Sequence, residues 1–244
     1  MAEQFEHRQA SQLSRLTSAA ISRHRHGDGE ILIVGLGRFG SSLALTLVDL
    51  GYDVMAIDSD LAHVQEYSGL LAHVVQADST SERALRQLGA ADVATAVVCI
   101  GTDVESSVLT TAALVDIGVP NVWAKAITTS HGRILQRVGA SHVVFPEAEM
   151  GRRVAHLVTG SMLEYLALDD EFTIVETTVP RWMVGKPLGQ TQLRATQQIT
   201  VVCVKPRGGR FTYAEPTTVL GADDLIVVAG HQRAVERFAA STDD

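Results

Sequence analysis

Residues 31–40 read ILIVGLGRFG, and this stretch decides the fold. Four aliphatic residues end at Val34, and Gly35, Gly37 and Gly40 follow in the spacing G-x-G-x-x-G. Glycines in this spacing allow a tight turn and let main-chain N–H groups approach a diphosphate at the N-terminus of the next helix. The stretch therefore predicts a strand, a phosphate-binding loop and a helix that together open a Rossmann-like domain.

Five further apolar runs follow the loop. They lie at residues 53–58, 72–76, 95–100, 121–125 and 141–145, with helical stretches between them. Near-continuous apolar strands that alternate with helices are typical of a parallel sheet covered on both faces, so we predict a doubly wound α/β domain. The predicted buried faces of two of the helices consist of Leu43, Leu47 and Leu50, and of Val104, Val108, Ala112 and Val115.

The rhythm of strands and helices changes near Pro146. We expect a flexible polar leader at 1–29, a nucleotide-binding domain at 30–147, a linker helix at 148–165 and a smaller α+β module at 166–240. An apolar stripe on the linker helix, from Met150 to Val158, would either pack within the chain or cross to another subunit. The predicted elements of the module are strands at 172–179, 200–205, 210–214 and 225–229, a short helix at 188–195, a turn at 207–209 and a last helix from His231.

The composition excludes several classes of function. A net charge of −8 argues against nucleic acid as a partner, and 46% hydrophobic residues indicate a globular protein. No run reaches the roughly 18 apolar residues of a membrane span, and the N-terminus lacks the apolar core of a signal peptide. Cys99 and Cys203 lie in strand-like runs and are expected to be small buried hydrophobes. We therefore expect a cytosolic protein.

An acidic residue ends the second predicted strand. Asp58, followed by Ser59, lies eighteen residues beyond Gly40, where a carboxylate can accept hydrogen bonds from both hydroxyls of a ribose. Asp78 and Ser79 follow the third strand, and Gly101 and Thr102 follow the fourth. Ligands bind at this edge of open α/β sheets, so we expect these residues to contact adenosine and phosphates. Asp, Ser and Thr also favour helix N-caps without any ligand, which is the alternative interpretation.

Arg38 and Phe39 lie inside the glycine loop. A guanidinium at this position can reach phosphate oxygens at the far end of a nucleotide or on a neighbouring chain. The alternative is a solvated arginine on a loop.

Several long segments, in one order along the chain, resemble the RCK (KTN) family of potassium-transport regulatory subunits, of the KtrA and TrkA type. They are ILIVGLGRFGSSLALTL, GYDVMAIDSD, ADSTSERALRQLGA, VVCIGTDVESSVLTTAALVDIGVPNVWAKA, ILQRVGASHVVFPEAEMG, DEFTIVETTVP and DDLIVVAGH. The resemblance implies a domain that binds ATP or ADP and a linker helix shared between subunits. It also implies a homo-oligomeric ring, commonly an octamer, beneath a membrane channel subunit of the KtrB or TrkH type that conducts potassium.

The resemblance also implies roles for single residues. Gly35, Gly37 and Gly40 match the phosphate loop, Asp58 matches the ribose acid, and Asp78 and Ser79 match the adenosine edge. Arg38 matches an arginine that meets the terminal phosphate of ATP, including one on an adjacent subunit. Lys125 matches a lysine near the phosphates, or else is a snorkelling residue at the end of a strand. Glu147 matches a glutamate that helps to hold a divalent or monovalent cation between paired nucleotides, or else interacts with a helix dipole.

The match is weaker in the smaller module. In some relatives this module binds cyclic di-AMP at a dimer interface, and Arg194 is the nearest match to the arginine that contacts its phosphate; a solvated helix arginine is the alternative. Ala77 precedes Asp78 where many relatives have glycine, and the leader is not part of the family pattern.

We expect no catalytic activity. ATP and ADP would compete for the glycine loop and stabilise different shapes of the ring, because only ATP offers a terminal phosphate to Arg38. One alternative is an NAD-dependent oxidoreductase, which the fingerprint alone would allow. It is disfavoured because the chain after residue 160 offers no recognisable pair of catalytic acid and base. Another is a regulator of a potassium exporter or antiporter that responds to NAD or NADH.

Overall fold

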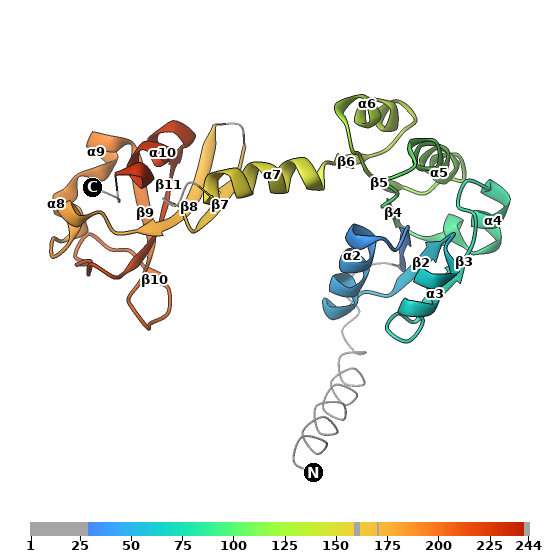
Figure 1. Cartoon of the computed structure of the whole chain (residues 1–244), viewed down its shortest axis with the longest axis horizontal. Helices are drawn as coiled ribbons and strands as arrows, with labels where there is room; N and C mark the ends of the chain where they lie inside the picture. The colour runs from blue at the N-terminus through green and yellow to red at the C-terminus, as the bar shows by residue number, and fades with distance from the viewer. Residues whose placement is uncertain (1–28, 159–161, 170, 242–244) are drawn as a thin grey trace, which may run out of the picture. The chain divides into compact units, whose positions relative to one another are not determined.

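The computed structural model describes residues 29–158, 162–169 and 171–241 of the chain (Figure 1). These residues form two compact units that divide between Pro146 and Glu147. The predicted leader lies outside the described residues, apart from Gly29. Within the described ranges, no helix combines the length and the apolar character that crossing a membrane requires.

The first unit is built on a six-stranded parallel sheet with the order β3-β2-β1-β4-β5-β6. Its strands are β1 (Ile31–Val34), β2 (Val54–Asp58), β3 (His73–Gln76), β4 (Thr95–Val98), β5 (Asn121–Lys125) and β6 (His142–Val144). The chain builds outward from β1 to β3 and then returns to place β4 on the other side of β1. The strand order therefore reverses between β1 and β4, at the point where open α/β sheets bind ligands.

Helices flank this sheet (Figure 1), and the sheet is apolar on both faces. Leu32 and Val34 of β1 belong to one core cluster and Ile33 to the other, because successive side chains of a strand point to opposite faces. The doubly wound fold predicted from the sequence is confirmed. The helical elements are α2 (Arg38–Asp49), α3 (Leu61–Tyr67), α4 (Glu82–Gln87), η1 (Ala90–Asp92), α5 (Val104–Asp116) and α6 (Thr129–Arg137).

The predicted buried face of α5 was partly wrong. Val104 is 39% exposed, whereas Ser107, Thr110 and Leu114 are fully buried. The Thr111 hydroxyl donates to the Ser107 carbonyl oxygen at 2.8 Å, which shows how a buried helix face can accommodate hydroxyl groups. Similarly, Leu50, which was assigned to the buried face of α2, is 66% exposed.

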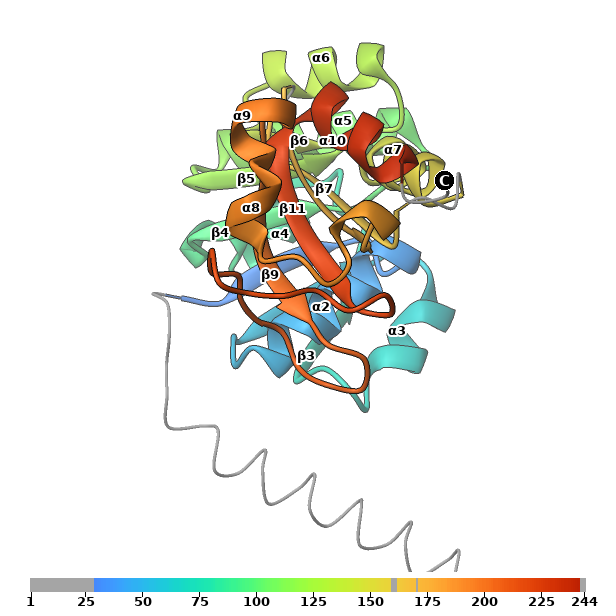
Figure 2. The ribbon, with the colours of Figure 1, turned by 90° about the vertical axis from the view of Figure 1, so that its left-hand side faces the viewer.

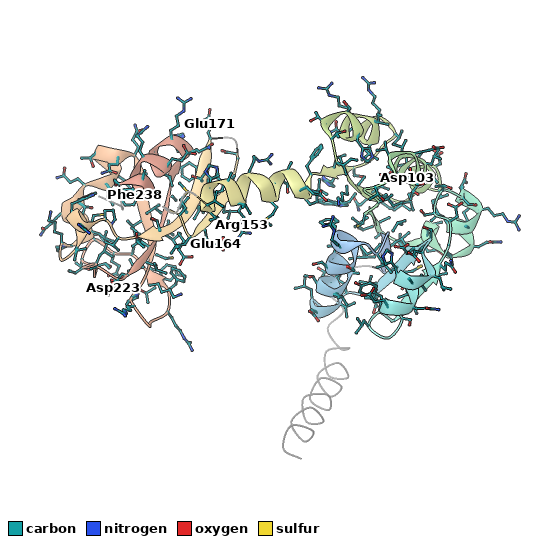
Figure 3. The ribbon with its side chains drawn as sticks, viewed as in Figure 1. Asp103, Arg153, Glu164, Glu171, Asp223 and Phe238 are labelled. Atoms are coloured by element: carbon teal, nitrogen blue, oxygen red, sulfur yellow. The ribbon has the colours of Figure 1, made fainter. Side chains whose placement is uncertain are left out.

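The second unit contains a five-stranded antiparallel sheet with the order β10-β9-β11-β8-β7. Figure 2 brings its strands β9 and β11 to the front. Its core includes Val175, Ile226 and Phe238, and Phe238 is labelled in Figure 3. The smaller α+β module predicted from the sequence is confirmed. The elements are α7 (Pro146–Leu157), β7 (Glu164–Ala167), β8 (Phe172–Thr178), η2 (Arg181–Met183), α8 (Leu188–Thr191), α9 (Leu193–Gln197), β9 (Ile199–Lys205), β10 (Thr212–Tyr213), β11 (Leu225–His231) and α10 (Gln232–Ala240).

Side chains of helix α7 contact side chains of this second sheet. Arg153 of α7 forms an ion pair with Glu164 of β7 (Figure 3). The ring of His156 stacks on that of Tyr165, with centroids 3.9 Å apart. The segment expected to be a linker helix to residue 165 is therefore helical to Leu157, and Glu164 and Tyr165 belong to an edge strand that the sequence analysis missed.

Candidate functional site

The conformation of the loop itself requires glycine at its first and third glycine positions. Gly35 has φ +95°, a left-handed conformation that side chains disfavour, and its N–H donates to the Ile57 carbonyl oxygen at 2.8 Å. A Cβ atom on Gly40 would lie 1.8 Å from the Gly35 carbonyl oxygen. Gly40 is therefore required for α2 to begin so close to the turn.

The conformation of the loop does not require glycine at the second position. Gly37 is the N-cap of α2 with φ −62° and ψ −176°, a conformation open to any residue, and a Cβ atom there would meet nothing within 4 Å. As a glycine, the N-cap residue has no side chain with which to cap this end of α2. The main-chain N–H groups at a helix start attract anions, so the space in front of Gly37 suits a diphosphate.

Asp58 ends β2 beside the loop and accepts several hydrogen bonds. Its Oδ2 accepts from the Leu36 N–H at 2.6 Å, and its Oδ1 accepts from the Asp60 N–H at 2.8 Å. The Asp58 side chain is only 10% exposed. The predicted ribose acid therefore also ties the glycine loop to the end of β2.

His63, in the first turn of α3, was missed by the sequence analysis. Its Nδ1 lies 3.2 Å from Oδ2 of Asp58. The only signal in the sequence was a histidine five residues after the acid, and that spacing does not by itself indicate a contact.

Lys125 brings a positive charge to the same edge of the sheet. It is the last residue of β5 and is only 8% exposed, so it is buried rather than snorkelling into solvent. Its Nζ lies 3.1 Å from where a Cβ atom of Gly101 would be, and 5.6 Å from the centroid of the Phe39 ring. The ammonium thus lies between the loop after β4 and the glycine loop.

The charge of Lys125 also acts on Cys99, which follows β4 and is buried as predicted. Burial raises the pKa of the Cys99 thiol to about 12, and the positive charge of Lys125 opposes that rise. Cys203 in β9 is only partly buried, so the prediction for that residue was too strong.

The two residues after β3 differ in their surroundings. Asp78 is exposed, and hydrogen bonds from the Thr80 hydroxyl and N–H lower the pKa of its carboxyl group. Ser79 is 8% exposed, and its hydroxyl shares a 2.8 Å hydrogen bond with that of Thr110 in α5. The Asp78 carboxylate is thus open to a ligand, whereas the Ser79 hydroxyl links the sheet to a helix.

The remaining predicted residues lie on the surface of one unit or the other. Arg38 is exposed at the start of α2, and Ser59 is exposed after β2. Glu147 is in the first turn of α7, in the second unit. Arg194 is on α9, where its Nε donates to the Thr200 hydroxyl at 2.9 Å. Among the described residues, no group of three or more His, Cys, Asp and Glu side chains is placed to hold a metal ion.

The first unit therefore brings three features to one edge of its sheet. They are an uncapped helix start at Gly37, a buried ammonium at Lys125 and a carboxylate at Asp58. The first two suit phosphate groups and the third suits a diol, which is the combination that a nucleotide presents.

Comparison with known proteins agrees with this fold. The sequence profile of the TrkA-N domain matches residues 31–146, and that of the TrkA-C domain matches residues 172–242. Among solved structures, the GsuK RCK domain superposes with a TM-score of 0.62 at 18% identity, over 92% of this chain and 50% of that one. A GsuK channel bound to NAD gives a TM-score of 0.60 at 19% identity, over 91% of this chain and 40% of that one. The chain thus spans half or less of those GsuK chains, and it has the two-domain architecture of RCK proteins.

Closer relatives identify the family. The Ktr system potassium uptake protein C of Bacillus subtilis (strain 168) is 35% identical over 212 residues, which are 86% of this chain and 95% of the relative. The Ktr system potassium uptake protein A of Vibrio alginolyticus is 34% identical over 208 residues, which are 84% and 94% of the two chains. The chain belongs to the RCK family of TrkA-N and TrkA-C domain proteins that includes these Ktr proteins.

Proposed function

We propose that this chain is a cytosolic regulatory subunit of a potassium transport system, without catalytic activity, that binds an adenine nucleotide at its glycine loop. Its relatives are named as potassium uptake proteins, which supports a role in potassium transport. The observation that carries nucleotide binding is the open space in front of Gly37 at the uncapped start of α2. A potassium pathway would then come from a membrane subunit bound to this chain.

The ligand is an adenine nucleotide whose diphosphate lies at the start of α2. Asp58 would accept from the ribose, Asp78 and Ser59 would line the adenosine side, and Lys125 and Gly101 would face the phosphates. ATP and ADP are our first candidates. NAD is the second, because a GsuK channel of the same fold has been solved bound to NAD, and an NAD-responsive regulator of potassium export is the corresponding alternative function.

Regulation requires a contact that differs between ligands. Arg38 is exposed beside the loop, so its guanidinium can reach a terminal phosphate that ATP has and ADP lacks, on its own subunit or on a neighbour. A ligand shifts a conformational equilibrium only by its difference in affinity for the two states. Arg38 would provide that difference in a homo-oligomeric ring, which we propose to be an octamer, and the ring would open or close the membrane subunit.

Two further contacts belong to this proposal. Glu147 would hold a cation between the phosphates of nucleotides on paired subunits, since a counter-ion reduces the repulsion of phosphates at low dielectric. Arg194 would contact cyclic di-AMP if the smaller module binds that second ligand.

The test is calorimetric titration of the purified protein with ATP, ADP, NAD and NADH, repeated on Asp58→Asn and Arg38→Ala. Binding of ATP and ADP that is weakened by Asp58→Asn, with a loss of ATP preference in Arg38→Ala, would support the proposal. Binding of NADH alone would favour the NAD-responsive alternative. Failure of all four nucleotides to bind, or turnover of an alcohol or a hydroxy acid with NAD, would contradict the proposed function.

A further inference from the structure

The contacts of Asp58 leave little room for a ribose. An ionised carboxylate offers about four positions for hydrogen-bond donors. Among the described residues, the Leu36 N–H, the Asp60 N–H and the His63 ring take three of them. Because the carboxylate only accepts, Nδ1 of His63 must carry the proton in this contact.

A ribose bound through both hydroxyls needs two of these positions, so one present donor has to leave. The Leu36 N–H belongs to a loop residue that is 1% exposed, and Asp60 is fixed as the N-cap of α3. The His63 side chain is 39% exposed and can rotate about its own bonds. His63 is therefore the donor that can move aside.

We propose that His63 competes with the ribose for Asp58 and thereby makes nucleotide binding weaker in acid. This inference rests on the proposed nucleotide site and adds a proton-dependent regulation to it. His63 acts as a positioning residue, because it works through Asp58 and not on the nucleotide itself.

The other titratable groups near α3 do not share this contact. Within the described part of the chain, Asp58 is the charged group at hydrogen-bond distance from the His63 ring. Elsewhere on the elements packed around α3, the titratable groups are Asp60 in the loop after β2, Glu66 and Tyr67 on α3, His73 on β3 (paired with Glu30) and Asp78 after β3.

The direction of the effect follows from charge. Imidazoles take up a proton between about pH 8 and pH 5, and a protonated ring binds a carboxylate more strongly than a neutral one. Nucleotide binding must break that contact, so affinity falls as the pH falls. Partly exposed ion pairs are weak, so we expect a loss of about two- to fivefold between pH 8.0 and pH 5.5.

The chain offers a matched control. His73 also pairs with a carboxylate, Glu30, at 2.6 Å, and lies at the start of β3 rather than beside Asp58. The experiment compares ADP affinity at pH 5.5 and pH 8.0 for the wild type, His63→Gln and His73→Gln. Ionisation of ADP is the same for every protein at a given pH, so it cancels in the comparison.

Between pH 8.0 and pH 5.5, the wild type should lose about two- to fivefold more affinity for ADP than His63→Gln does. Glutamine can still donate a hydrogen bond to Asp58, but it takes up no proton in this range. His73→Gln should behave as the wild type does. The same pH dependence in His63→Gln and the wild type would overturn the inference, as would an equal reduction in both variants. Absence of ADP binding to the wild type at both pH values would instead refute ADP binding at the proposed site.

A second measurement uses the wild type alone. 2′-Deoxy-ADP has a single ribose hydroxyl, which the fourth position on Asp58 can accept while His63 stays in place. Its affinity should therefore change less with pH than that of ADP. An equal pH dependence for the two ligands would overturn the competition for Asp58.

Discussion

The N–H of Leu36, in the middle of the glycine loop, donates a 2.6 Å hydrogen bond to Oδ2 of Asp58 at the end of β2. The proposed phosphate loop and the proposed ribose acid are thus joined directly, from positions 22 residues apart in the sequence. A substitution at Asp58 will consequently alter both the ligand contact and the support of the loop, and the two effects can be separated by the choice of substitution.

Asp58→Ala should lower the free energy of unfolding by about 1–3 kcal/mol, because the N–H of the buried Leu36 loses its acceptor. Asp58→Asn keeps an amide oxygen that can accept from Leu36, so its loss should be smaller. Both should weaken nucleotide binding. Urea unfolding and calorimetric titration measure the two effects, and equal stability of the two variants would show that the Leu36 contact is unimportant.

Gly40→Ala and Gly37→Ala should have opposite consequences. A methyl group at position 40 would collide with the Gly35 carbonyl oxygen, so we expect destabilisation of about 1–3 kcal/mol or more. At position 37 the methyl group meets open space and costs less than about 1 kcal/mol, but it points toward the proposed diphosphate. Thermal unfolding and nucleotide titration of the two variants test this contrast. Unchanged affinity in a folded Gly37→Ala variant would speak against a diphosphate there.

Lys125→Met should weaken nucleotide binding by about tenfold or more while the protein stays folded, since loss of a charge-assisted hydrogen bond costs about 1.5–3 kcal/mol. Methionine keeps an unbranched side chain next to Phe39 and Gly101 and removes a buried charge. The exposed Lys186, in the second unit, provides the control Lys186→Met. Equal affinity of the two variants would argue against a phosphate contact for Lys125.

Cys99 should resist alkylation in the folded protein. With the pKa of its thiol at about 12, roughly one molecule in 10⁴ carries the reactive thiolate at pH 8, and the side chain is buried as well. The more accessible Cys203 serves as the internal reference. Mass spectrometry after treatment with iodoacetamide at pH 8 should find Cys99 modified only when the protein is unfolded first.

The stability that Asp103 provides should depend on pH. This N-cap of α5 accepts from the Ser106 N–H and hydroxyl, which lowers the pKa of its carboxyl group below 3.8. A lowered pKa in the folded state means that the contribution is present above about pH 3.8 and is lost as the pH falls through the folded value. Thermal unfolding should find the wild type more stable than Asp103→Asn at pH 7, with a difference that shrinks as the pH falls below 3.8. A difference that stays constant with pH would contradict this account.

The parallel sheet could be predicted from the sequence because its strands are buried on both faces and read as continuous apolar runs. Strand β7 could not be predicted in the same way. It lies within the apolar run MLEYLAL at residues 162–168, and a short apolar run cannot be told from a helical segment by its pattern alone. The sequence pattern instead predicted that the linker helix continues to residue 165.

The site was predictable as a set of backbone positions but less so as a set of side chains. The three glycines and Asp58 meet at one edge because the topology of parallel strands requires it. The partners of Ser79 and His63, however, depend on rotamers and on which face of a helix is buried. Ser79 forms its hydrogen bond with Thr110 on the hydroxyl-rich face of α5. In the sequence, that face resembles one exposed to solvent.

The pairing of β7 with β8 bears on where the second unit could be cut out for separate expression. The TrkA-C profile begins at residue 172, yet residues 164–167 form four consecutive pairs with β8. A fragment that started at residue 172 would leave one side of β8 without its neighbour, and an unpaired edge of that length invites aggregation. It would also discard α7, and with it both the Arg153–Glu164 ion pair and the stack of His156 on Tyr165. A fragment that begins at or before Pro146 keeps α7, β7 and the covered edge together.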